Sequence, residues 1–231
     1  MAFHEPNILH EDPWLVAVDK QSGLAVHRGW AQDEVVLTDL LEPRCGKGCV
    51  HPLGRLDRGT SGVLLVARNG GDVETFRNAI RAEGAQRCYI ALVRGVPPES
   101  GVIDYPIPNE PDGPRVEART SFRLLASRPT EPRAVSLVAA FPHTGRLHQI
   151  RRHLRHITHP LIGDANYGRP DLNRALRAAY GLARLALHCA RVRLRHPFTD
   201  ELLELAAPVP EDLAGPLGRM GFSALDWGPP E

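Results

Sequence analysis

Short apolar runs bounded by turn-forming residues recur along the 231-residue chain and predict a protein rich in strands. Residues 14–19 and 23–28 both favour strands and are joined by Lys-Gln-Ser, so they are expected to form a hairpin. Four further strands are expected at residues 63–68, 88–95, 120–125 and 134–141.

Two segments have the periodicity of amphipathic helices. Residues 72–83 predict a helix with Asp72 as N-cap and Phe76 on its apolar face. A second helix is predicted in the middle of residues 142–168, where four aliphatic residues recur at spacings of three, four and three: Leu147, Ile150, Leu154 and Ile157.

The second helix contains two adjacent arginines that should differ in role. At about 100° per residue, Arg152 projects roughly opposite the centre of the apolar face, whereas Arg151 lies only about 80° from that centre. Arg152 is therefore expected to offer its charge to solvent or phosphate. Arg151 either bends inward toward a partly buried anion or covers the core with its aliphatic stem.

Strands with occasional helices, without a regular βαβ repeat, indicate the α+β class. We expect a single domain with a mixed, mainly antiparallel central sheet flanked by helices and loops. A hydrophobic content of 42% can fill such a core. No stretch has the pattern of a signal peptide or the roughly 20 apolar residues of a membrane span, so a cytoplasmic protein without membrane contact is expected.

Charge is distributed unevenly although the formal net charge is only +1. Residues 140–196 contain eleven arginines, seven of the eleven histidines and only two acidic residues. Within this block the sequence RVRLR alternates, so Val192 and Leu194 should face the core and the arginines should face outward. A local basic surface on a nearly neutral protein points to a polyanion, although a merely solvated face has the same composition.

No metal is expected. Cys45, Cys49 and His51 are close in sequence, but the usual second pair of zinc ligands is missing.

One aspartate, Asp57, stands between two arginines in the stretch LGRLDRGTSGVLLVAR, just before an apolar run. Three segments, GRLDRGTSGVLL, RCYIALVRG and TGRLHQIRRHLRHITHPLIGD followed by YG, occur in the order found in the RluA-type RNA pseudouridine synthases. The resemblance spans about residues 11–222, and three ordered motifs are far more specific than any one alone. It implies the pseudouridine synthase fold in one catalytic domain over residues 1–231, with no S4-type RNA-binding domain.

The resemblance also implies the chemistry. Asp57 takes the place of the family's catalytic nucleophile, and the reaction isomerises a uridine without a cofactor. Tyr89 matches the motif tyrosine that stacks on the target base. Arg151 matches the arginine thought to pair with the aspartate, an assignment that agrees with its predicted position at the edge of the apolar face; Arg146 is the alternative.

RNA is the implied partner of the basic residues. Arg55 matches the arginine that enters the space left by the flipped base, and Gly54 stands where relatives usually have histidine. The residues predicted to contact RNA are Arg55, Arg58, Arg146, His148, Arg152 and Arg155. Thr60, Ser61 and Gly62 are expected to shape the loop that presents Asp57.

The resemblance is strongest to the branch that acts on uridine 65 of tRNA, and a monomer is expected. Ribosomal RNA is the alternative substrate, because site choice depends on RNA shape. A non-catalytic RNA-binding protein is the alternative from another class. A hydrolase is disfavoured because the chain has neither a G-x-S-x-G elbow nor a P-loop pattern.

Overall fold

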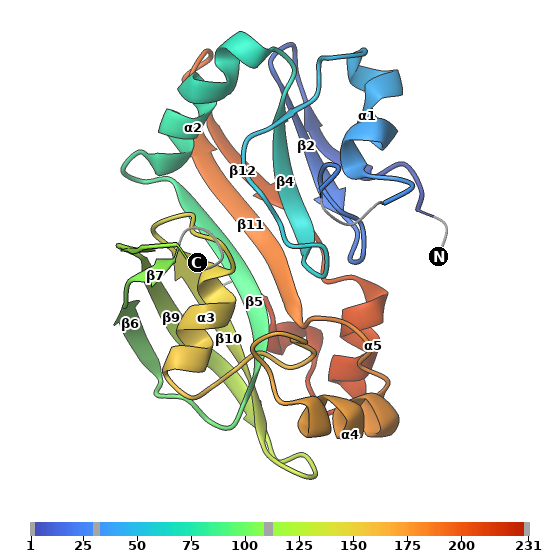
Figure 1. Ribbon diagram of the computed structural model, residues 1–231, viewed down its shortest axis with the longest axis vertical. Helices are drawn as coiled ribbons and strands as arrows, with labels where there is room; N and C mark the ends of the chain where they lie inside the picture. Colours follow the sequence, from blue (N-terminus) through green and yellow to red (C-terminus); the bar gives the residue numbers. More distant parts are fainter. Residues whose placement is uncertain (1–2, 30–32, 109–112, 229–231) are drawn as a thin grey trace. The chain divides into compact units, whose positions relative to one another are not determined.

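The computed structural model describes residues 3–29, 33–108 and 113–228, and its contacts group the chain into two compact units (Figure 1). Unit 1 comprises Met1–Arg87 with Cys189–Pro208, and unit 2 comprises Cys88–His188 with Val209–Glu231. Each unit contains a predominantly antiparallel sheet and helices, so the α+β class is confirmed. None of the helices in the described ranges is long and apolar enough to cross a membrane.

The sheet of unit 1 runs in the order β1, β2, β4 and β11, with β3 beside β4 and β12 beside β11. Side chains of β2 and β4 are buried at nearly every position, which requires cover on both faces. The strands are β1 (Asn7–Glu11), β2 (Leu15–Lys20), β3 (His51–Pro52), β4 (Ser61–Ala67), β11 (Leu187–Arg195) and β12 (Leu202–Ala206). The helices are α1 (Leu37–Cys45), the 3₁₀ turn η1 (Gly70–Asp72) and α2 (Val73–Arg81).

The predicted hairpin between residues 14–19 and 23–28 is wrong. β2 covers most of the first run, but it pairs with β1 on one side and β4 on the other, so neither edge remains for the second run. The second run contributes only one isolated bridge. Leu24 and Val26 are nevertheless buried, so the apolar pattern there reflects contact with the core rather than strand pairing.

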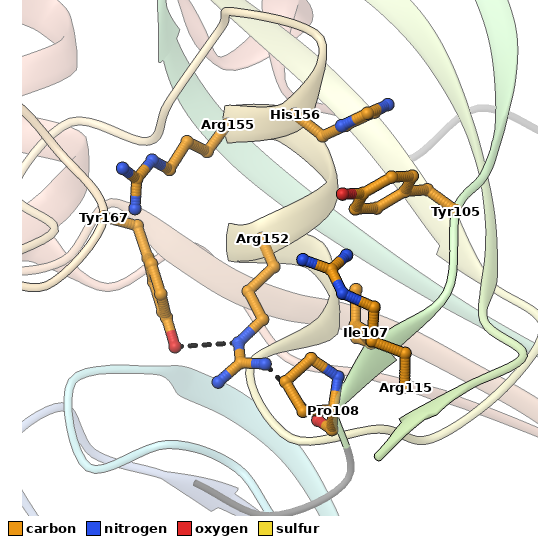
Figure 2. Close-up of a pocket in the computed structure, with 8 residues that line it drawn as sticks. All are labelled: Tyr105, Ile107, Pro108, Arg115, Arg152, Arg155, His156 and Tyr167. Carbon is orange, nitrogen blue, oxygen red and sulfur yellow. Dashed lines mark hydrogen bonds between the residues drawn. The ribbon is translucent and has the colours of Figure 1, made fainter. Parts of the chain in front are cut away.

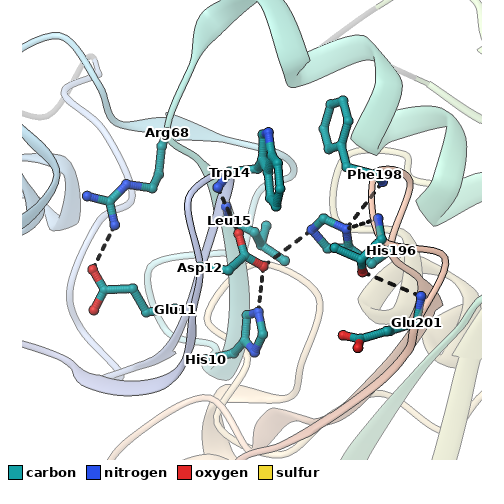
Figure 3. Close-up of polar contacts among 10 residues, drawn as sticks. His10, Glu11, Asp12, Trp14, Leu15, Arg68, His196, Phe198 and Glu201 are labelled. Atoms are coloured by element: carbon teal, nitrogen blue, oxygen red, sulfur yellow. Dashed lines mark hydrogen bonds and ion pairs between the residues drawn. The ribbon is translucent and has the colours of Figure 1, made fainter.

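Asp12 joins the turn between β1 and β2 to the turn between β11 and β12 (Figure 3). Its Oδ1 accepts hydrogen bonds from the backbone N–H groups of Trp14 and Leu15, both at 2.7 Å. Its Oδ2 lies 2.7 Å from Nε2 of His10 and 3.3 Å from Nε2 of His196. Nδ1 of His196 accepts two backbone N–H bonds from the β11–β12 turn, so the Nε2 atom carries the proton and faces the carboxylate.

Helix α2 packs on this part of unit 1 through one aromatic side chain. Phe76 is fully buried and meets the rings of His196 and Phe198 edge-on, with centroid separations of 5.3 and 5.6 Å. The predicted helix over residues 72–83 is therefore confirmed in its core, with Asp72 at the N-cap position. The alternation predicted in β11 is also confirmed, because Val192 and Leu194 are buried.

The sheet of unit 2 runs in the order β5, β10, β9 and β6, and all three pairings are antiparallel. Central strands β5 and β10 are buried along most of their length, as their continuous apolar runs predicted. The strands are β5 (Gln86–Arg94), β6 (Ser100–Asp104), β9 (Arg119–Arg128) and β10 (Val135–Pro142), with a short separate pair of β7 (Ile107–Pro108) and β8 (Arg115–Val116).

Helix α3 (Gln149–His156) contacts β9 and β10. Of the four predicted apolar positions, Ile150 and Leu154 are buried on the helix, whereas Leu147 and Ile157 flank it and are half-buried. Arg151 is buried, whereas Arg152 is half-buried. Helices α4 (Pro170–Tyr180) and α5 (Glu211–Arg219) contact each other, and η2 (Ala224–Asp226) follows α5.

The chain that follows α3 runs between β5 and the loop preceding β11. The backbone N–H of Ile162 donates to Leu92 at 2.9 Å, and the N–H of Ala186 donates to Ile162 at 3.0 Å. Gly163 has φ +76°, and a Cβ at this position would lie 1.8 Å from the carbonyl oxygen of Arg184. Glycine is therefore required both by its backbone conformation and by the close approach.

Gly163→Ala should destabilise the protein by about 3 kcal/mol or more, because strain from positive φ adds to a backbone clash. Gly48→Ala is the matched control, since Gly48 has φ +77° but open space around it. It should cost only about 1–2 kcal/mol. Urea unfolding of both variants measures the difference, and equal losses would contradict the role of the clash.

Candidate functional site

The loop between β3 and β4 carries Asp57 in unit 1. Leu53 and Leu56 are buried beneath it, Arg55 is exposed and Asp57 is half-buried. The N–H of Thr60 donates to the carbonyl of Asp57 at 2.9 Å and closes a tight turn. The two buried leucines therefore anchor the loop, and the charged residues between and after them lie at its surface.

Residues at the end of β2 and in the turn after it donate hydrogen bonds to backbone carbonyl groups of the Asp57 loop. The side chain of Lys20 is fully buried, and its ammonium donates to the carbonyl of Arg58 at 3.3 Å and to two carbonyls of its own turn at 2.8 Å. Ser22 Oγ donates to Gly59 at 2.9 Å, and the N–H of Gly23 donates to Arg58 at 2.7 Å. A buried ammonium is tolerated only with such partners, so Lys20 holds the loop of Asp57 in place, a contact that the sequence patterns did not indicate.

Arg58 has a partner of its own. Its guanidinium forms two contacts with the carboxylate of Asp33, at 2.5 and 2.6 Å, while the side chain remains half exposed. The carbonyl group of Arg58 also accepts hydrogen bonds from Lys20 and Gly23, so both its side chain and its backbone are held in the loop. Its predicted contact with RNA stays a prediction.

Gly62 begins β4 at a point where β11 passes very close. Its φ is +106°, and a Cβ would lie 2.2 Å from the carbonyl oxygen of Cys189. Thr60 and Ser61 are both buried. A larger residue at position 62 would push the start of β4 away from β11, so the loop containing Asp57 depends on this glycine. Gly54, in contrast, is exposed, and a Cβ there would meet nothing within 4 Å.

The other two predicted catalytic residues lie in unit 2. Tyr89 is buried on β5, where it pairs in register with Ala140 of β10. Arg151 is 7% exposed on α3. The pairing of Arg151 with Asp57 stays a prediction from the resemblance.

Arg151 forms a bidentate ion pair with Asp164, whose carboxylate is fully buried. Nε donates to Oδ2 at 2.7 Å, and Nη2 donates to Oδ1 at 2.8 Å. Oδ1 also accepts the backbone N–H groups of Asn166 and Tyr167. Arg151 therefore turns inward toward a buried anion, the first of the two alternatives that its sequence position left open.

These contacts decide the ionisation of Asp164. Burial by itself raises the pKa of its carboxyl group. The hydrogen bonds from Arg151 and from the backbone outweigh burial, so the pKa lies below its ordinary value. Asp164 was not among the predicted site residues, although its position in the L-I-G-D stretch, just beyond a basic helix, is a signal that could have found it.

A chain of hydrogen bonds attaches α3 to β9. Gln149 Nε2 donates to Thr120 Oγ1 at 2.9 Å, and His153 Nδ1 lies 2.8 Å from the same hydroxyl. His153 Nε2 lies 3.0 Å from the carbonyl oxygen of Tyr105, which can only accept, so this nitrogen carries the proton. Burial lowers the pKa of His153, in agreement with a neutral ring. The helix that carries Arg151 is thus held rigidly on the sheet.

Three residues predicted to contact RNA gather around Tyr167. Its hydroxyl accepts a hydrogen bond from Arg152 Nε at 2.8 Å and lies 3.0 Å from Nδ1 of His148. The guanidinium carbons of Arg152 and Arg155 lie 5.4 and 6.0 Å from the ring centroid. Arg146 lies in the preceding loop and donates to the carbonyl of Glu117 at 3.1 Å.

Cys45, Cys49 and His51, which are close in sequence, all lie within the described ranges. No group of three or more His, Cys, Asp or Glu side chains in those ranges could hold a metal ion. Cys45 and Cys49 have free thiols, and burial raises the pKa of the Cys45 thiol.

The sequence matches the family described as RNA pseudouridylate synthase over residues 14–156. The protein named tRNA pseudouridine synthase C of Pasteurella multocida is 36% identical, and the alignment covers 87% of this chain and 90% of that protein. The protein of the same name from Salmonella typhimurium is also 36% identical, with 94% and 91% covered.

Solved structures give the same result. The structure called Human RNA Pseudouridylate Synthase Domain Containing 4 matches with a TM-score of 0.72 and 28% identity, covering 93% of this chain and 92% of that one. Human RNA Pseudouridylate Synthase Domain Containing 1 has the same TM-score at 23% identity and shares the fold. The matched segment includes Asp57, Tyr89 and Arg151, and the chain belongs to the RluA-type RNA pseudouridylate synthases, as its three motifs predicted.

Proposed function

We propose that this RNA isomerase converts uridine 65 of tRNA into pseudouridine, with Asp57 as the nucleophile. The observation that carries the proposal is the loop of Asp57, in which the family motif is held by Lys20, Ser22 and Gly23. The relatives named tRNA pseudouridine synthase C, matched over most of their length, support tRNA as the substrate class. We expect the protein to work in the cytoplasm as a monomer.

The reaction breaks the N1–C1′ bond of the uridine, rotates the base and joins C5 to C1′. C5 then loses its proton and N1 gains one, so reactant and product contain the same atoms and no cofactor is required. An ionised Asp57 either attacks C1′ or stabilises positive charge that develops there, as carboxylates do in glycosidases. Uracil can leave as a delocalised anion, which removes the need for a second acidic residue.

Arg151 and Tyr89 are proposed to act on the same uridine. A guanidinium favours the charged form of a carboxylate, and Arg151 is assigned this role toward Asp57. Tyr89 is assigned to stacking on the base. Asp164 is proposed as a positioning residue, because its bidentate ion pair limits the orientations open to Arg151.

The target uridine must leave its stem, at a cost of a few kcal/mol in lost stacking and pairing. Arg55 is proposed to fill the vacated space, which agrees with its exposure on the loop of Asp57. Arg58, Arg146, His148, Arg152 and Arg155 are proposed to contact the RNA backbone.

Asp57→Asn should reduce release of tritium from RNA labelled at uridine C5 to the level of an enzyme-free sample, because the amide cannot replace the carboxylate at C1′. Asp171→Asn, which removes a carboxylate that is 94% exposed, should leave release unchanged. Bulk tRNA and ribosomal RNA are supplied separately. Release from ribosomal RNA alone would show that ribosomal RNA, not tRNA, is the substrate. If the unmodified protein releases no tritium from either RNA, a non-catalytic RNA-binding protein would be favoured.

Substitutions of Arg151 and of Arg152 should change different kinetic parameters. Arg152→Ala should raise KM, most strongly at low salt and less at higher salt, since a phosphate contact is lost and binding depends less steeply on salt. Arg151→Ala and the milder Arg151→Lys should chiefly lower kcat, by roughly 10-fold or more. Single-turnover and steady-state assays separate the two effects, and equal changes in both parameters for both positions would refute the division of roles.

Asp164→Asn should lower the free energy of unfolding at pH 7 by about 3–5 kcal/mol, because the buried Arg151 loses its bidentate carboxylate partner. The lowered pKa of Asp164 means that the carboxylate stabilises the fold above the ordinary value of 3.8. This stabilisation is lost as the pH falls through the lowered pKa.

Urea unfolding between pH 8 and pH 3 tests this expectation. The difference from the unmodified protein should stay constant down to about pH 4 and shrink below it. Asp171→Asn, on the surface of α4, should change stability by less than about 0.5 kcal/mol. A difference that persists unchanged at low pH would argue against the ion pair as its source.

A further inference from the structure

An open pocket of about 310 Å³ lies in unit 2, between α3, the β7–β8 pair and the loop after α3 (Figure 2). Its volume is at the lower end of the range for small-ligand sites. Eight residues line it: Tyr105, Ile107, Pro108, Arg115, Arg152, Arg155, His156 and Tyr167. Arg115, Tyr105 and His156 were not among the predicted site residues.

Among the described residues, the lining carries three guanidinium groups and no carboxylate. Within the described ranges, Arg115, Arg152 and Arg155 form no ion pair. Other arginines of unit 2 do: Arg128 pairs with Asp226 and Arg184 pairs with Asp212. Three positive charges directed at one pocket, with no counter-ion among the residues that the structure describes, are typical of a site for an external anion.

Aromatic rings and carbonyl groups hold two of these guanidinium groups in place. The guanidinium carbon of Arg115 lies 5.0 Å from the ring centroid of Tyr105, and its Nη1 donates to the carbonyl of Pro106 at 3.1 Å. Arg152 donates through Nε to the hydroxyl of Tyr167 and through Nη1 to the carbonyl of Pro108 at 3.3 Å. These side chains are therefore already partly ordered, and they lose less conformational entropy when a ligand binds.

The ring of Tyr105 lies between His156 and Arg115 (Figure 2). It stacks on the ring of His156, with a centroid separation of 3.7 Å and an interplanar angle of 18°. With one face on the imidazole and the other under the guanidinium, Tyr105 offers no free face for a nucleobase. The pocket therefore favours a phosphate, which guanidinium forks bind through charge-assisted hydrogen bonds.

We propose that this pocket binds a backbone phosphate of the RNA substrate, with Arg115 as a phosphate ligand and Tyr105 as the residue that positions it. The inference rests on the proposed function for its choice of RNA as the source of the phosphate. It adds the β7–β8 pair to the RNA-contacting surface, which the sequence had located only on α3, the loop that precedes it and the Asp57 loop.

The test is the salt dependence of RNA binding, measured with bulk tRNA by filter binding between 50 and 300 mM KCl. Arg115→Gln should make the slope of log K against log salt shallower by about 0.7–0.9, the value for one lost phosphate contact. Its Kd at 150 mM salt should rise roughly fivefold. The change is expected in binding, because the pocket contains no group assigned to the chemistry.

Arg174→Gln is the matched control, since it removes the same charge from an exposed position on α4 that does not line the pocket. Its slope should equal that of the unmodified protein. Equal changes in both variants would show a long-range charge effect and overturn the proposal. So would calorimetric binding of inorganic phosphate that requires Arg115 while the RNA slope is unchanged, since the pocket would then serve a free anion.

Variants at Tyr105 test its positioning role. Tyr105→Phe keeps the ring over which Arg115 lies and should bind RNA normally, whereas Tyr105→Leu should reproduce the shallower slope of Arg115→Gln. If both variants bind normally, Tyr105 does not position Arg115. Binding is measured without turnover, so an unmodified protein that binds tRNA but releases no tritium would reject the proposed function and leave this inference standing.

Discussion

The buried ion pair between Arg151 and Asp164 determines how unit 2 presents its basic residues. Two charges removed from water are tolerated only when nearly all of their hydrogen-bonding capacity is used, and Asp164 meets this condition with two bonds from the guanidinium and two from backbone N–H groups. One of those N–H groups belongs to Tyr167. The same pair therefore orients Arg151 on the helix and fixes the tyrosine whose hydroxyl holds Arg152 and contacts His148.

The basic block of the sequence contains arginines with two kinds of surroundings. Arg151 is buried and pairs with the buried Asp164, and the largely covered side chain of Arg184 pairs with the exposed Asp212, so both charges are balanced by carboxylates of the chain itself. Arg152 and Arg155 make no ion pair within the described ranges and line an open pocket. The tRNA substrate proposed here would supply the missing negative charge. A protein with a net charge of only +1 can in this way bind a polyanion through one local surface.

The sequence alone was sufficient to predict the family, the α+β class and the strands that lie in the core. The runs that became β4, β5 and β10 are long and apolar, and such strands are specified by their own burial whichever neighbours they have. The two faces of α3 followed from helical geometry, which depends only on spacing. Edge strands such as β6 and the two-residue strands were missed, because their patterns are too short or too polar to stand out.

The tertiary structure decided which elements pair and which polar groups meet. Residues 23–28 look like a strand but do not form one, because both edges of β2 are occupied by β1 and β4, and competition for an edge is invisible in a local pattern. Lys20 and Asp164 meet partners that are 38 and 13 residues away, Arg58 and Arg151. The ring of Tyr105 meets Arg115 and His156. Composition and motifs could single out Asp57 and the basic helix as candidates for catalysis and RNA binding. Only the folded chain fixes which carbonyl or carboxylate satisfies each charge, because hydrogen bonds form between neighbours in space.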